Sequence, residues 1–285
     1  MNIPVNIKEI IATVNMEDII ILLPGVILFA FWLLHTSYGR KALENSLPRR
    51  NDMPVLQPLV LFFVIFLAIG LGDSLILDLT KNLENQLQVF ISESVKCILA
   101  LASIAIILCY VKKHFVRGIK GFGLNIKTIP KDFVMAFINL FAVYPLIYFV
   151  FLATTIINEL IYGPNYQIPT HVELQTMEQN TSLLIRITIT ISVVVVTPFL
   201  EEMLFRGLFQ TTIRSILNMK YSAWIAIFAT SLFFVVNHAN PSHWPILFIL
   251  SACMGYSYEK SGSLFRSIFI HAIFNGSAII SIWHS

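Results

Sequence analysis

Eight continuous apolar runs constrain this chain more than any other feature of its sequence. They lie at 19–35, 54–72, 95–111, 133–157, 183–200, 222–238, 244–258 and 264–283. A helix needs about 20 mostly apolar residues to cross a bilayer, and the runs are uninterrupted rather than alternating, which argues against a β-barrel. Only 12% of the residues are charged and 56% are hydrophobic. Because soluble domains carry about 25% charged residues, we predict an all-α fold, a polytopic membrane helix bundle of about eight transmembrane helices.

The loops between these runs differ in charge. The loops after the first, third, fifth and seventh runs are basic, whereas the segment 158–182 contains acidic residues and no Lys or Arg. Since Lys and Arg accumulate in cytoplasmic loops, we expect a multi-pass protein of the cell membrane with both ends of the chain outside. The first run follows Glu17 and Asp18 rather than a basic region, which predicts a permanent span instead of a cleaved signal peptide.

Net charge and cysteine content make two further classes of protein poor fits. The formal net charge of +3 is too small to indicate nucleic-acid binding, so the expected surroundings are the lipid bilayer and no nucleic acid. The three cysteines, Cys97, Cys109 and Cys253, all lie in apolar stretches without metal-ligand spacing. We expect them to be packed as small apolar residues and to form no disulfide.

Ionisable residues inside a bilayer are costly, and here they concentrate in the last third of the chain. The first cluster, Glu201, Glu202 and Arg206, follows an apolar run in which Pro198 can kink the helix. Positions four apart share a helix face, so Glu202 can pair with Arg206, while Glu201 points about 100° away. This geometry neutralises one acid and leaves the other without a partner in its own helix. An ordinary charge cluster at a helix end is the simpler alternative.

Two further pairs lie on the sixth and eighth runs. Phe234 and His238 are four residues apart, as are His271 and Asn275. Each pair alone could only join helices by packing or hydrogen bonds. With a turn near Leu217–Lys220, antiparallel helices would bring Glu201 and His238 to similar depth, where they could share a water molecule.

Together the three clusters favour hydrolysis of a peptide bond by an activated water. A carboxylate such as Glu201 can act as general base, and His238 can assist it. His271 and Asn275 could then donate hydrogen bonds to the oxyanion that forms on the attacked carbonyl.

The order Glu-Glu-x-x-x-Arg, Phe-x-x-x-His and His-x-x-x-Asn on late membrane spans resembles the CPBP intramembrane protease family. That family includes type II CAAX prenyl endopeptidases and bacterial Abi-related proteins linked to bacteriocin processing or immunity. The resemblance implies water activation by Glu201 and His238 and oxyanion support by His271 and Asn275. It also implies an eight-helix bundle whose active site is accessible from the cytoplasmic side. It covers about 183–283, and we expect 183–285 to form the protease core and 1–182 to supply the other helices of the same bundle.

Other protease signatures are incomplete. Gly70-Leu71-Gly72-Asp73 fits the Gly-x-Gly-Asp pattern of aspartyl intramembrane proteases, but no second aspartate lies in a clear span. The chain contains no His-Glu-x-x-His stretch, which disfavours a conventional zinc protease. Zinc stays an alternative, because Glu201, Glu202, His238 and His271 have suitable donor atoms. We expect no metal cofactor, since Arg206 beside the carboxylates disfavours a further dication.

The leading hypothesis is therefore a glutamate-dependent intramembrane endopeptidase. Its partner would be a membrane-associated peptide or protein substrate, either of CAAX type or a peptide or bacteriocin precursor. The alternative is a non-proteolytic bacteriocin-immunity or scaffold membrane protein of the same fold, because fold does not fix function. A transporter is disfavoured, since its polar residues would line a path across several helices rather than converge late in the chain.

Overall fold

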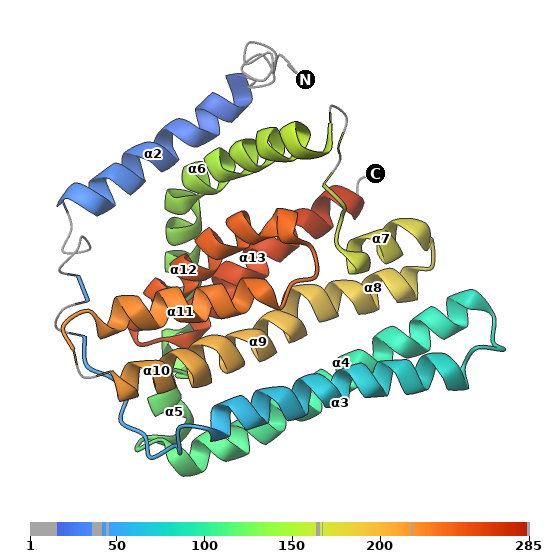
Figure 1. The fold of residues 1–285 in the computed structure, drawn as a ribbon, viewed down its shortest axis with the longest axis horizontal. Helices are drawn as coiled ribbons and strands as arrows, with labels where there is room; N and C mark the ends of the chain where they lie inside the picture. Colours follow the sequence, from blue (N-terminus) through green and yellow to red (C-terminus); the bar gives the residue numbers. More distant parts are fainter. Residues whose placement is uncertain are drawn as a thin grey trace.

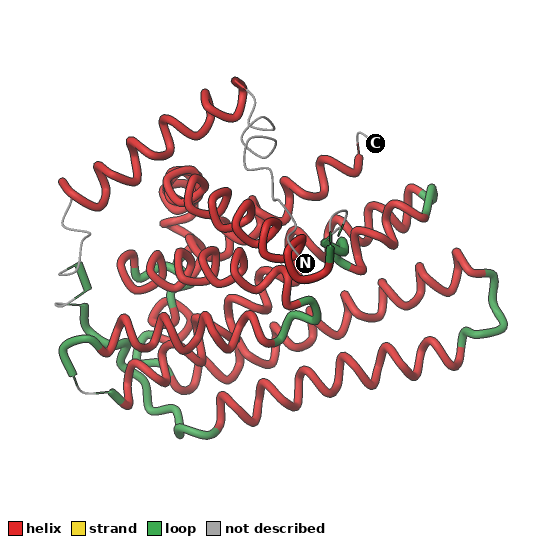
Figure 2. The backbone as a smooth tube through the Cα atoms, turned by 45° about the horizontal axis from the view of Figure 1, so that its top comes forward, coloured by secondary structure: helices red, strands yellow, loops and turns green. Residues whose placement is uncertain are grey.

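The computed structural model describes residues 16–35, 42–43, 46–163, 166, 168–217 and 219–283. Within these ranges the chain is helical and contains no β-strand, only an isolated bridge between Asn51 and Phe115. Figure 1 shows long helices packed side by side, and Figure 2 shows that most of the described chain is helical. The predicted all-α bundle is confirmed.

Each apolar run predicted from the sequence coincides with a helix. In chain order the long elements are α2 (Met16–His35), α3 (Gln57–Leu79), α4 (Asn85–His114), α6 (Ile129–Tyr162), α8–α10 (Leu183–Ile216, with two π-helical stretches), α11 (Ser222–Val236), α12 (Trp244–Ser261) and α13 (Leu264–Trp283). The short elements are α5 (Gly118–Phe122), η1 (Ile126–Thr128), α7 (Val172–Gln179) and η4 (Pro241–His243).

Five helices in the described part of the chain are long and apolar enough to cross a membrane. They are Gln57–Leu79, Asn85–His114, Ile126–Tyr162, Leu183–Ile216 and Leu264–Trp283. Helix α11 is apolar but has only 15 residues. The protein is therefore a multi-pass membrane protein by helix length and composition, while the number of eight spans stays a prediction.

The basic loops gather at one end of the bundle, which we call the basic end. Arg49, from the first basic loop, donates to the carbonyl of Tyr258 at the end of α12. The amide of Leu264, at the start of α13, donates to the carbonyl of Gly123 in the second basic loop. Arg214, near the end of α10, donates to the carbonyl of Ser46. The opposite end, which carries α7 and contains no Lys or Arg in 158–182, is called the acidic end.

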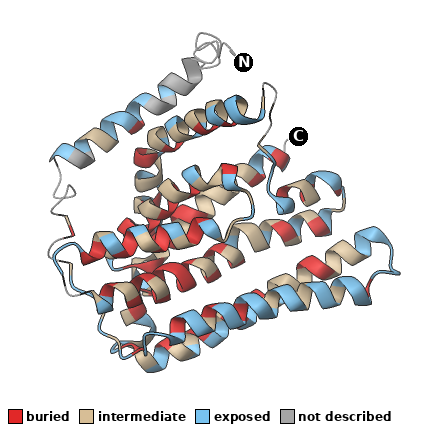
Figure 3. Ribbon diagram, viewed as in Figure 1, coloured by how far each residue is buried: buried red, intermediate tan, exposed pale blue. Residues whose placement is uncertain are grey.

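Buried residues are most frequent in α9–α13, whereas α3 and α4 are largely exposed and add a few residues to the same core (Figure 3). Close packing in this core explains why a glycine, Gly207, directly follows Arg206 of the first motif. A Cβ atom at Gly207 would lie 2.0 Å from the ring of Phe122, which is fully buried. The hydroxyl of Tyr258 in turn donates to the carbonyl of Phe122. The segment after α4 is thus anchored in the core next to the first motif.

Candidate active site

The helix that carries the first motif is interrupted on both sides of the two glutamates. Ser192–Val196 and Met203–Gln210 are π-helical, and Thr197–Glu202 between them is α-helical. In the first π-helical stretch the amide of Thr197 donates to the carbonyl of Ser192, five residues earlier. The next amide in that register would belong to Pro198, which has no N–H and leaves the carbonyl of Val193 without its helical partner. Such local breaks in helices are frequent at functional sites.

The Asn275 side chain supplies the hydrogen bond that Pro198 cannot make. Its Nδ2 donates to the carbonyl oxygen of Val193 at 3.0 Å, from α13 to the kinked helix. One amide proton of Asn275 therefore stabilises the break in the backbone. Its predicted donation to an oxyanion is not tested by this geometry and stays a prediction.

Glu202 and Arg206 form the ion pair that the four-residue spacing predicts. Arg206 Nη1 lies 2.7 Å from Glu202 Oε1, and the two side chains are 1% and 0% exposed. Arg206 Nη2 also donates to the backbone carbonyl and the hydroxyl of Ser251 on α12, at 3.1 and 2.7 Å. A buried charge needs such partners, because removing it from water is costly.

His271 contacts both glutamates of the first motif. Its Nδ1 lies 3.0 Å from Glu202 Oε1, and its Nε2 lies 3.8 Å from Glu201 Oε2. The same Glu202 oxygen accepts from Arg206, so we assign His271 Nδ1 as the donor to it, and this contact fixes the ring orientation. Glu201 has no partner in its own helix, as predicted, and its side chain is 26% exposed. The paired acid orients the histidine, and the other acid keeps an accessible carboxylate.

The ring of Phe234 joins all three motifs. It is fully buried, and the guanidinium carbon of Arg206 lies 4.8 Å from its centroid. The ring centroids of His238 and His271 lie 4.7 and 5.9 Å away. A cation over an aromatic ring is stabilised by the ring quadrupole. Phe234, the first residue of the second motif, therefore lies between Arg206 of the first motif and His271 of the third, and its ring sets the distance between these two motifs.

His238 lies just beyond the end of α11, at the side of the site that faces the acidic end. Its Nδ1 is 2.9 Å from the carbonyl oxygen of Phe234, which fixes Nδ1–H as the donor and leaves Nε2 as an acceptor. Trp244 Nε1 donates to the backbone carbonyl of His238 at 2.9 Å. Among the described residues no hydrogen bond joins Glu201 to His238, so their shared water stays a prediction.

Two more histidines lie next to His238. The ring centroid of His171, which precedes α7, is 6.4 Å from that of His238 and 4.4 Å from that of His243. Burial, together with the neighbouring imidazoles of His171 and His238, lowers the pKa of His243 to about 4. Burial also lowers the pKa of His171, against the opposing charge of Glu173. At neutral pH both rings are therefore mostly uncharged.

The alternative zinc-ligand set does not converge in this geometry. Glu202 Oε1 already accepts hydrogen bonds from Arg206 and His271. Within the described ranges, no group of three or more His, Cys, Asp or Glu side chains is arranged to hold a metal ion. Independence from metal remains a prediction.

Sequence reasoning identified Glu201, Glu202, Arg206, His271 and Asn275. The structure joins the first four through ion pairs and hydrogen bonds, whereas Asn275 binds the Val193 carbonyl of the kinked helix. Sequence reasoning gave no role to three groups that contact these residues: the Phe234 ring, Ser251 and the Val193 carbonyl. Phe234 could have been found as the first residue of its motif. Ser251 and Val193 carry no sequence signal, because only the three-dimensional packing brings them to the site. His171, which the sequence analysis did not single out, lies next to His238.

Comparison with known proteins agrees with this assembly. Residues 183–277 match the family model "Type II CAAX prenyl endopeptidase Rce1-like". The match is to less than half of the chain, but it contains every residue of the three motifs. No curated protein and no solved structure matches the chain. Residues 183–277 are therefore similar to an Rce1-like domain, which is consistent with the CPBP resemblance.

Proposed function

We propose that the protein is an intramembrane endopeptidase that hydrolyses peptide bonds of membrane-associated substrates by a water activated at Glu201. The observation that carries this proposal is the position of His271 between two different glutamates: Glu202 is buried and paired with Arg206, whereas Glu201 is partly exposed and lies 3.8 Å from His271 Nε2. A purely structural charge cluster would bury both carboxylates. Here Glu202 orients the imidazole of His271 through Nδ1, and Glu201 lies beside Nε2 of the same ring.

The proposed reaction uses these groups in sequence. Glu201 takes a proton from a water molecule whose oxygen attacks the scissile carbonyl carbon. With N–H on both ring nitrogens, His271 donates to Glu202 through Nδ1 and to the developing oxyanion through Nε2. The C–N bond then breaks, and protonated Glu201 returns the proton to the leaving amine. The products are a carboxylic acid, which keeps the second hydrogen of the water, and an amine, and the Glu201 carboxylate is regenerated.

His238 fits a supporting role in this scheme. Because Nδ1–H is engaged by the Phe234 carbonyl, the Nε2 lone pair can accept a hydrogen bond from the attacking water. We propose Asn275 as a second support for the oxyanion, through the amide proton that does not bind Val193. The reaction requires no metal in this proposal. The substrate class is a CAAX-type protein or a peptide or bacteriocin precursor that reaches the site from the membrane.

The side of access is a separate proposal. The charge pattern places the basic end in the cytoplasm of a cell-membrane protein, and the family resemblance implies cytoplasmic access. However, His238 lies on the side of the site that faces the acidic end, next to His171. This position favours access from the acidic end instead. Cysteines at Arg49, Gln175 and Ala239, tested with an impermeant thiol reagent in intact cells, distinguish the two: cytoplasmic access predicts that Ala239→Cys is shielded like Arg49→Cys.

A non-proteolytic immunity or scaffold protein is the second candidate function, since the same fold could bind a partner without cutting it. The deciding experiment compares membrane proteomes of cells that produce the wild type, Glu201→Gln or no protein. The endopeptidase proposal predicts uncut precursors in both the Glu201→Gln and the deletion cells. A scaffold predicts that Glu201→Gln behaves as wild type. His238→Ala should match Glu201→Gln while leaving an inserted, folded protein.

A further inference from the structure

Helix α12 presents two chemically different faces. Ser251, Met254, Gly255 and Tyr258 are buried and face the first motif, where Ser251 binds Arg206 and the carbonyl of Gly255 accepts from Gln210. The other face carries residues with the same helical spacing, Ile249, Ala252, Cys253 and Tyr256. Positions related by three, four and seven residues share a helix face. One face of α12 therefore packs against the candidate active site, and that site does not account for the residues on the other face.

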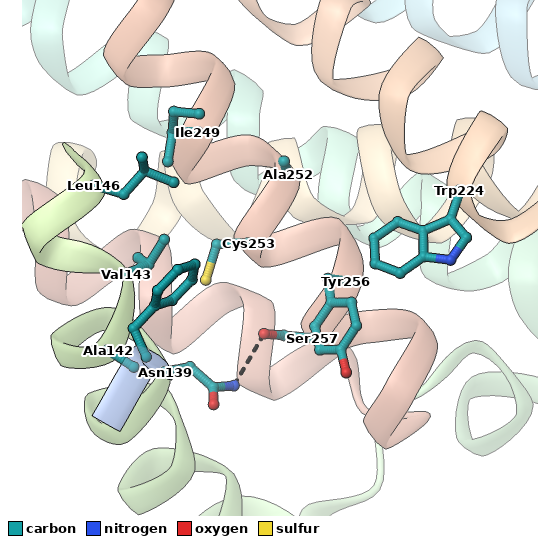
Figure 4. A pocket seen from close by; sticks show the side chains of 11 residues that line it. Asn139, Ala142, Val143, Leu146, Trp224, Ile249, Ala252, Cys253, Tyr256 and Ser257 are labelled. Carbon is teal, nitrogen blue, oxygen red and sulfur yellow. Dashed lines mark hydrogen bonds between the residues drawn. The ribbon is translucent and has the colours of Figure 1, made fainter. Parts of the chain in front are cut away.

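The second face lines a cavity between α12, α6, α11 and α2. The cavity has a volume of about 170 Å³, smaller than a typical small-molecule site. Figure 4 shows Ala252 and Cys253 on α12 opposite Val143 and Leu146 on α6. The walls are almost entirely apolar side chains. The complete lining is Phe29, Asn139, Ala142, Val143, Leu146, Trp224, Ile249, Ala252, Cys253, Tyr256 and Ser257.

The cavity is amphipathic along its length. Its polar groups, the Asn139 amide and the Ser257 hydroxyl, form a 3.0 Å hydrogen bond toward the basic end (Figure 4). Trp224, near the start of α11, stacks on Tyr256 with ring centroids 5.7 Å apart. Trp and Tyr prefer the level of lipid headgroups in membrane proteins. The apolar part extends from this level toward the middle of the bundle, at the bend of α6 around Pro145.

The cavity face of α12 ends in a positive charge. Lys260 lies four residues after Tyr256 and continues the stripe of Ile249, Cys253 and Tyr256. Its ammonium is 3.3 Å from the carbonyl oxygen of Ala42 in the first basic loop. The apolar cavity, the aromatic pair and Lys260, which lies beyond the cavity lining, thus follow one another along α12 in the order of the parts of a phospholipid. This charge favours an anionic headgroup.

We propose that this cavity binds the acyl chain of an anionic phospholipid from the leaflet at the basic end. The chain packs against α12 on the face opposite Arg206, and the headgroup phosphate lies near Lys260. In a membrane protein a lateral apolar opening is filled by hydrocarbon rather than water, because water finds no polar partners there. This site does not depend on peptidase activity and is separate from the proposed substrate site.

The test uses the full-length protein in vesicles that contain phosphatidylglycerol and phosphatidylcholine, one of which carries a photoreactive acyl chain. After irradiation, mass spectrometry maps the crosslinked residues. We expect crosslinks at Ile249, Ala252 or Cys253, with a preference for phosphatidylglycerol. Lys260→Gln should reduce this preference about fivefold, the factor expected for one basic residue near anionic lipid.

Two matched variants separate the cavity from general lipid contact. Ala252→Trp fills the cavity and should remove the α12 crosslinks, whereas Ala102→Trp on the exposed face of α4 should not. If Ala252→Trp does not fold, the wild-type map and Lys260→Gln still decide the question. Crosslinks spread evenly over all exposed helix faces would overturn the site. Displacement by farnesol with no headgroup preference would overturn the phospholipid as occupant.

Discussion

Arg206 and Arg266 both pair with a carboxylate inside the bundle, but the two pairs hold different things in place. Arg206 and Glu202 are one turn apart on the same helix, so their contact joins no two helices. Arg266 on α13 binds Asp132 on α6 through Nε and Nη2, at 3.1 and 2.9 Å. The second pair is a clamp between helices at the basic end. The Glu202–Arg206 pair reaches other helices through its neighbours, Ser251 on α12 and His271 on α13.

This difference shows how one kind of interaction serves two purposes. The Glu202 oxygen that accepts from Arg206 also accepts from His271, so the arginine fixes the charge that orients a candidate catalytic ring. The carboxylate of Asp132 has no comparable link, and its Oδ2 has no hydrogen-bond partner among the described residues. We therefore expect the Glu202–Arg206 pair to support the reaction and the Asp132–Arg266 pair to stabilise the helix bundle.

The largest expected effect comes from removing the carboxylate charge of each pair. Glu202→Gln and Asp132→Asn each leave a buried arginine unpaired, which typically costs about 3–5 kcal/mol of unfolding free energy. Glu202→Gln should in addition lower peptide cleavage per folded molecule about 100-fold, because His271 loses its orientation. Asp132→Asn should leave cleavage per folded molecule unchanged. Thermal unfolding in detergent and a cleavage assay measure the two quantities, and equal activities in the two variants would contradict the comparison.

Double variants test the same difference between the two ion pairs, and we expect smaller losses of stability than the single changes predict together. Glu202→Gln with Arg206→Ala should be less destabilising than the sum of the single changes, because no charge is left stranded. Activity should not recover with stability, since His271 is still without its partner. Asp132→Asn with Arg266→Ala should regain stability in the same way and keep its activity. Additive losses of stability would remove the ion-pair argument for that pair.

The smallest effect concerns the kink beside the glutamates. Asn275→Ala leaves the Val193 carbonyl unpaired and should cost about 1–3 kcal/mol. Pro198→Ala supplies an amide that can bind this carbonyl, so the loss from Asn275→Ala should shrink in that background. Unfolding free energies of the four proteins measure the coupling. Absence of coupling would contradict the backbone role of Asn275, and a loss of activity that persists in the Pro198→Ala background would support its role at the oxyanion.

Sequence reasoning reached the helices, the turn near 217–220 and the Glu202–Arg206 pair, because each depends on local periodicity or spacing. It could not reach the π-helical stretch Ser192–Val196, where the Val193 carbonyl accepts from Asn275 on α13, 82 residues later. The Asp132–Arg266 clamp was missed for the same reason: its residues are 134 positions apart. Short helices such as α11 were predicted as full spans from hydropathy, although α11 ends at Val236 and leaves His238 in the following turn.

The central claim is that water activated at Glu201 beside His271 cuts a peptide bond. The most direct measurement incubates the purified protein in vesicles with a library of membrane-anchored peptides in water enriched in oxygen-18. The account predicts products whose new carboxyl terminus carries one oxygen-18 atom, formed by the wild type and absent with Glu201→Gln, while both proteins unfold at similar temperatures. Cleavage by Glu201→Gln at the wild-type rate, or no cleavage by a folded wild type over the whole library, would contradict it.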